Sequence, residues 1–85
     1  MIKPGTTLQL QIRKGLYMSE GPRQAEAGDY IIYLGFGTPM VGNDFSKQLF
    51  MKFLLHGVYY EDCDSYSSEK EAQSRLLEFA EVVSE

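Results

Sequence analysis

The stretch that decides the fold is TLQLQIRK at residues 7–14, where Leu8, Leu10 and Ile12 alternate with polar side chains. Successive side chains of a β-strand point to opposite faces, so this alternation predicts a strand with one face on the core and the other in water. Gly15 interrupts the pattern and indicates a bulge or a bend before the strand continues. The rest of the chain is therefore expected to build on a β-sheet.

A second strand is predicted after a polar connection. Residues 19–28 contain Gly21, Pro22 and Gly28 among polar side chains, a composition typical of a surface connection. Residues 29–36 are apolar on both faces and rich in β-branched and aromatic side chains, as a central strand is. We expect the two strands to pair antiparallel.

Residues 44–56 are compatible with two structures. Their apolar side chains fall at helical spacing, Asn43 or Asp44 offers an N-cap, and Gly57 stands where a C-terminal cap belongs. We therefore predict a helix. Every second residue across 49–55 is also apolar, so a further strand paired with the second one is the alternative.

The C-terminal part of the chain predicts an amphipathic helix. Ser68 and Glu71 have the spacing of a capping box, which satisfies the first free amide groups of a helix. The apolar stripe of this helix consists of Ala72, Leu76, Phe79, Ala80 and Val83. The predicted fold class is α+β, in which residues 1–85 form a single domain and a small antiparallel sheet of three or so strands packs against this helix.

Composition favours a small globular protein of a reducing compartment. The chain has 85 residues, 44% of them hydrophobic and 24% charged, which is an ordinary globular mixture with a thin core. Its start lacks the apolar region of a secretory signal, and its most apolar runs are about seven residues long, against the roughly 18–20 that cross a bilayer. We expect no membrane partner. Cys63, the single cysteine, cannot form an internal disulfide and so favours the cytoplasm.

No residue pattern indicates a catalytic or metal site. Cys63 lies among acidic residues that disfavour its thiolate, and together with His56, the single histidine, it cannot complete a zinc site. A calcium loop beginning at Asp62 would need Gly and Glu where Ser67 and Gln73 stand. We therefore predict a protein that is not an enzyme and that uses no cofactor.

Aromatic and acidic residues near the C-terminus favour a role in protein binding. The chain contains six Tyr and five Phe, more than a thin core encloses completely, and exposed tyrosine rimmed by charge is typical of protein interfaces. We predict a protein-binding module, such as an inhibitor or accessory protein of phage or bacterial type. The predicted binding patch consists of Tyr59, Tyr60, Asp62, Asp64, Tyr66, Glu71 and Glu78. Residues 61–85 carry eight Asp/Glu against two Lys/Arg, and a specific form of the hypothesis is that this acidic tail imitates nucleic-acid phosphate.

A single-stranded nucleic-acid binder is the alternative, because a weakly basic sheet with tyrosines can stack bases. The basic residues are Lys3, Arg13, Lys14, Arg23, Lys47 and Lys52, and the tyrosines are Tyr17, Tyr30 and Tyr33. Nucleic acid is the less favoured partner, since the basic residues form no cluster and the chain has a net charge of −4. The thin core is also compatible with a homodimer joined through an edge strand or an exposed apolar helix face.

Overall fold

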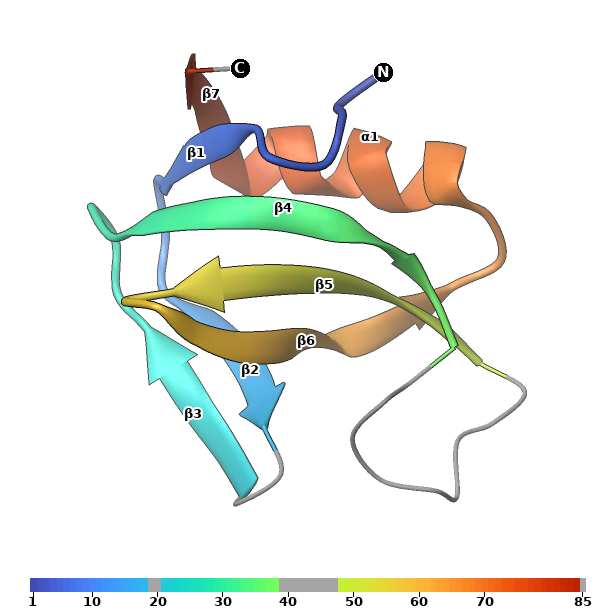
Figure 1. Cartoon of the computed structure of the whole chain (residues 1–85), viewed down its shortest axis with the longest axis horizontal. Helices are drawn as coiled ribbons and strands as arrows, with labels where there is room; N and C mark the ends of the chain where they lie inside the picture. The colour runs from blue at the N-terminus through green and yellow to red at the C-terminus, as the bar shows by residue number, and fades with distance from the viewer. Residues whose placement is uncertain (19–20, 39–47, 85) are drawn as a thin grey trace.

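The structure is a computed structural model that describes residues 1–18, 21–38 and 48–84, and its dominant feature is one antiparallel sheet (Figure 1). The strands of the described chain are β1 (Thr7–Leu10), β2 (Lys14–Met18), β3 (Gly21–Ala25), β4 (Tyr30–Gly37), β5 (Leu49–Leu55), β6 (Val58–Tyr66) and β7 (Ala80–Ser84), and its helix is α1 (Glu69–Phe79). Across the sheet the strands follow the order β3-β2-β6-β5-β4-β1-β7. The predicted fold class, a small sheet of three or so strands packed against a helix, is therefore wrong: the sheet has seven strands, and the helix is short.

The predicted helix over residues 44–56 is also wrong where the structure describes it, because Leu49–Leu55 forms β5 between β4 and β6. Residues 44–47 lie outside the described residues. The hairpin turn that joins β5 to β6 explains the error. His56 and Gly57 both have positive φ, 52° and 77°, as the two central residues of a tight hairpin turn require. The glycine that resembled a helix cap is therefore a hairpin residue, and the alternative interpretation as a strand is confirmed.

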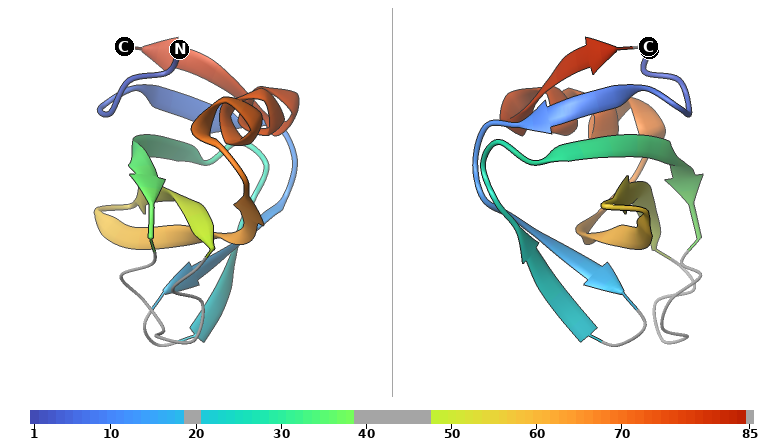
Figure 2. Two further views of the ribbon diagram at one scale, coloured as in Figure 1. Left: turned by 90° about the vertical axis from the view of Figure 1, so that its right-hand side faces the viewer. Right: turned by 60° about the vertical axis from the view of Figure 1, so that its left-hand side comes forward.

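The sheet curls into a half-barrel because its first strand is bent. β1 and β2 are separated only by residues 11–13, yet β1 pairs with β4 while β2 pairs with β6. The two ends of the β4-β5-β6 meander are thus held by two halves of one stretch of chain (Figure 2). The alternation predicted one strand over residues 7–14 that continues past Gly15. The structure instead divides this stretch into β1 and β2, and the bend at residues 11–13 lies just before Gly15.

The core lies between the curled sheet and α1. Buried side chains from the sheet include Tyr33 and Phe53, whose rings pack edge to face with centroids 6.0 Å apart. The helix contributes Ala72, Leu76 and Phe79 of the predicted stripe, whereas Ala80 and Val83, which were predicted on the helix, lie on β7. Among the described residues, no helix has the length and apolar character needed to cross a membrane.

The predicted start of α1 is confirmed, although its capping box is only half formed. Ser68 is the N-cap, and its Oγ accepts a hydrogen bond of 3.2 Å from the Glu71 amide. The Glu71 carboxylate accepts instead from Ser67 Oγ at 2.7 Å. The helix is thereby fixed directly after β6, with its first turn beside the end of that strand.

A buried glutamine joins α1 to the start of the chain. Gln73 is 5% exposed; its Nε2 donates to the Ile2 carbonyl at 2.8 Å, and its Oε1 accepts from the Ile2 amide at 2.7 Å. The side-chain amide thus pairs with both backbone groups of Ile2, which would otherwise be buried without partners. Helix and N-terminus are held together by this pair.

Candidate functional site

The structure separates the seven residues of the predicted binding patch. Tyr60 and Asp62 are 2% and 1% exposed, so neither is on the surface. Tyr59 is half-buried and faces the opposite side of the sheet from its neighbour Tyr60, and its hydroxyl donates to Glu61 Oε2 at 2.8 Å. Glu71 is exposed on the first turn of α1.

The other three residues, Asp64, Tyr66 and Glu78, meet around one shallow pocket between β6, α1 and the bend that follows β1. We call it the α1–β6 pocket; its volume is about 180 Å³. Its lining consists of Ile12, Lys14, Asp64, Tyr66, Arg75, Glu78 and Phe79. A volume of this size lies below the roughly 300–1,000 Å³ of typical ligand pockets and is comparable to one large amino-acid side chain.

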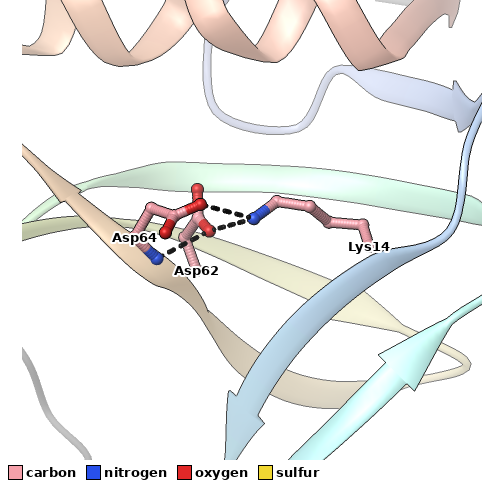
Figure 3. Close-up of polar contacts among 3 residues, drawn as sticks. All are labelled: Lys14, Asp62 and Asp64. Carbon is pink, nitrogen blue, oxygen red and sulfur yellow. Dashed lines mark hydrogen bonds and ion pairs between the residues drawn. The ribbon is translucent and has the colours of Figure 1, made fainter.

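One wall of the pocket rests on a buried ion pair (Figure 3). Lys14 Nζ lies 2.6 Å from Asp62 Oδ1 and 3.2 Å from Asp64 Oδ2, so β2 and β6 are connected by one cation between two carboxylates. The Asp64 amide also donates to Asp62 Oδ1 at 3.0 Å. The ammonium lies 5.3 Å from the centroid of the Phe79 ring, which adds a cation–π contact from the helix. Lys14 is therefore fixed from three sides.

Burial dominates the electrostatics of this cluster. The Asp62 side chain is fully buried, and its Oδ2 has no hydrogen-bond partner among the described residues. Burial raises the pKa of Asp62, and the contact with Lys14 offsets only part of this effect. For Lys14, burial alone would lower the pKa, but the hydrogen bonds and charges of Asp62 and Asp64 outweigh it and the pKa is raised. Lys14 therefore stays charged at neutral pH, and the cluster of one cation and two carboxylates has an excess of negative charge.

The rim of the pocket is charged and open, while its floor is apolar. The side chains of Asp64 and Glu78 are 67% and 63% exposed, and Glu78 pairs with Arg75 on the preceding helical turn at 2.9 Å. Ile12 is 54% exposed and Phe79 is buried, so an exposed and a buried apolar side chain lie in the same small hollow. Arg75 offsets the charge of Glu78, so the excess negative charge at the pocket comes from the two carboxylates, Asp62 and Asp64, that share the Lys14 ammonium. An apolar hollow beside this excess charge suits a partner that inserts one apolar side chain and carries a cation next to it.

No protein-family model, curated protein or solved structure matches this chain. The chemistry of the pocket therefore follows from its own side chains. In the described part of the chain, no group of three or more His, Cys, Asp and Glu residues is arranged to hold a metal ion. Cys63 lies on β6 between Asp62 and Asp64 and is exposed; burial, then Asp62 and Asp64, raise the pKa of its thiol against the opposing effect of Lys14. These pKa shifts disfavour the thiolate that a nucleophile requires.

Four residues that line the pocket were not part of the binding patch predicted from the sequence. Ile12 belonged to the predicted strand, and its exposure follows from the bend after β1; Gly15 indicated a bend, but not that it would place Ile12 outside the core. Lys14 is 48 positions from Asp62, so nothing near either residue indicates their pairing. Arg75 and Phe79 were predicted on α1, and only the amphipathic pattern of that helix could have suggested that they lie together.

The nucleic-acid interface proposed as an alternative is not assembled in the described residues. Tyr33 is fully buried, and its hydroxyl donates to Glu69 Oε2 at 2.7 Å. Lys14 is in the buried ion pair, and Arg13 pairs with Glu26 at 3.1 Å. Lys47 lies outside the described residues.

Proposed function

We propose that this chain is a small, non-enzymatic protein-binding module and that the α1–β6 pocket receives one apolar side chain of its partner. The single observation that carries the proposal is the meeting of Asp64, Tyr66 and Glu78 with the exposed Ile12 around one hollow. Burying the exposed isoleucine and the half-buried tyrosine against a partner removes apolar surface from water, which is favourable. The carboxylates beside the hollow favour a basic partner. Such a module acts by occupying its partner's surface, as an inhibitor or accessory protein does.

The charge of the pocket supports a partner with Lys or Arg next to the inserted side chain. Lys14 is neutralised by Asp62 within the cluster, which leaves the Asp64 carboxylate on the rim with one oxygen turned to the ammonium. Glu78 is exposed on the other side of the hollow, where Arg75 offsets its charge. Because the rim carboxylates are partly exposed, an ion pair between one of them and a cation of the partner would add little affinity. We therefore expect the charges to determine selectivity and association rate, and the apolar contact to supply the affinity.

Cytoplasmic location remains part of the proposal. Cys63 is exposed and has no second cysteine to pair with, which suits a reducing compartment.

Selection from a random peptide library tests the proposal, because such a library offers the pocket every combination of apolar and charged neighbours. The wild-type protein should enrich peptides in which an apolar residue has Lys or Arg within a few positions. Ile12→Lys should abolish the enrichment, since it places an ammonium in the apolar hollow, and Glu78→Lys should weaken it and remove the preference for basic neighbours. Both positions are more than half exposed, so these variants should fold.

Val58→Lys is the matched control. Val58 is an exposed apolar residue of the sheet, 40% exposed, and it does not line the α1–β6 pocket. This variant should select the same peptides as the wild type. Enrichment that survives Ile12→Lys, or peptides without basic residues, would show that the pocket is not the binding site.

A further inference from the structure

The edge of the sheet formed by β7 has unused hydrogen-bonding capacity. β7 pairs with β1 on one side and has no strand partner on the other among the described residues. The amide and carbonyl groups of Leu10 bond to the β4 side, whereas the Gln11 amide bonds to the Phe79 carbonyl on the β7 side. The hydrogen-bonding direction of the backbone alternates along a strand, so the amide and carbonyl groups of Gln9 point towards its partner Glu81 on β7. It follows that the backbone groups of Val82, the next residue of β7, point away from β1 to the free edge.

The opposite edge of the sheet is protected. β3 is the last strand on that side and contains Pro22, which has no amide hydrogen to donate to a further strand. Its neighbours Arg23 and Gln24 are exposed and polar. Of the two edges of the described sheet, the β7 edge is the one without a proline, although its register with β1 shifts by one residue directly after Val82. One open edge per molecule leads to a closed pair instead of a growing fibre.

Apolar side chains gather beside the β7 edge. Leu77 of α1 and Val82 of β7 are 54% and 40% exposed, and Met1 is 85% exposed. These three residues line the same hollow of about 350 Å³ next to the start of the chain. Figure 2 shows the N-terminus, β7 and α1 close together at this end of the molecule. The free strand and the apolar surface therefore form one continuous region.

We propose that a second copy of this chain pairs antiparallel with β7 and forms a symmetric dimer about Val82. In this register each Val82 exchanges both backbone hydrogen bonds with Val82 of the other copy. Glu81 of one copy then lies opposite Val83 of the other, so no two carboxylates face each other across the axis. The two-fold axis also puts Leu77 of both copies on the same side of the joined sheet, where apolar surface is buried. The strand can thus pair with itself through its backbone groups without placing two carboxylates opposite each other, which is the reason for proposing a second copy as the partner.

Sedimentation over a wide concentration range tests the dimer. The wild type should approach twice the monomer mass of 9.7 kDa as concentration rises. Val82→Lys should raise the dissociation constant by about tenfold or more, since it opposes two ammonium groups at the axis. Val58→Lys, which changes an equally exposed valine elsewhere in the sheet, should leave it unchanged. A monomer at every concentration up to millimolar, or equal effects of the two substitutions, would overturn the proposal.

A cross-link tests the register. In a Cys63→Ser background, Val82→Cys should form an intermolecular disulfide in air, because directly opposed residues of an antiparallel pair lie about 5.5 Å apart between Cα atoms, within the range that a disulfide spans. Val58→Cys in the same background is the control and should remain mostly reduced. Similar yields from both variants would refute the register. Because Ile12 lines the α1–β6 pocket and not the hollow beside β7, Ile12→Lys should leave the dimer intact, which keeps this test separate from that of the pocket.

Discussion

Replacing Lys14 with methionine should destabilise the protein more than any other single change of a charged residue. The substitution keeps the packing on Phe79 but leaves the Asp62 carboxylate buried, with its Oδ2 already unpaired among the described residues. Breaking a buried ion pair on one side typically costs about 3–5 kcal/mol. A domain of this size has about 5–15 kcal/mol of stability at most, so we expect the variant to unfold much more easily at 25 °C.

The pKa of Asp62 determines how the loss of stability in Lys14→Met depends on pH. In the folded protein the pKa of Asp62 is raised above its ordinary value of 3.8, and the loss of Lys14 raises it further because Lys14 opposes the burial effect. A raised folded pKa means that folding takes up a proton, so stability is lost as pH rises through that window. The deficit of Lys14→Met relative to the wild type should therefore be largest at pH 7 and should shrink towards pH 4, as Asp62 takes up a proton.

Urea denaturation followed by circular dichroism at pH 4 and pH 7 measures this deficit. The double variant Lys14→Met/Asp62→Leu is the control, since replacing a whole buried pair by apolar residues is often neutral or stabilising. It should recover most of the loss and should show little dependence on pH in this range. A deficit below about 1 kcal/mol at pH 7, or a double variant no more stable than the single one, would refute the assignment of a buried ion pair.

Three further outcomes follow from the fold. Gln73→Leu leaves both backbone groups of Ile2 unpaired and should cost about 2–4 kcal/mol in urea denaturation, with faster hydrogen exchange at the Ile2 amide; the same exchange rate in both proteins would contradict the pairing. Gly57→Ala forces alanine to a φ of 77° and should cost about 1–2 kcal/mol, read as a lower melting temperature. Burial and the Glu69 contact raise the pKa of Tyr33 to about 12, so alkaline absorbance titration should lose one late tyrosine step in Tyr33→Phe; an unchanged titration curve would show that the hydroxyl is not held in this way.

Local patterns were enough to predict the elements that depend on local contacts. The alternation from Leu8 to Ile12 indicated the first strand, and Ser68 with Glu71 indicated the start of α1, because a strand face and a helix cap are each decided within a few residues. The His56–Gly57 turn shows the limit of this reasoning. A glycine with positive φ ends a helix and also closes a hairpin, and only the strands on either side decide between the two.

The candidate site could be predicted only in part because it depends on distant contacts. Aromatic and acidic composition led to Asp64, Tyr66 and Glu78, which do meet in the structure. The same reasoning counted Tyr60 and Asp62 as surface residues, because composition does not tell which side of a strand is covered. The burial of Asp62 depends on the pairing of β2 with β6, and this pairing depends in turn on the bend in the first strand.

The Lys14–Asp62 ion pair has two roles that can be separated. Breaking it should destabilise the core, and its ammonium also shapes the proposed binding surface. A pair of apolar residues at positions 14 and 62 would fill the same space with equal or greater stability, so stability alone does not explain a buried Lys14. What the apolar pair lacks is the ammonium that holds Asp64 at 3.2 Å on the wall of the pocket. The double variant Lys14→Met/Asp62→Leu should therefore fold as well as the wild type and still lose selectivity for basic peptides, because Asp64 is then free to turn into solvent. Retained selectivity in that variant would instead make the pair a purely structural feature and would leave Glu78 as the main source of the acidic rim.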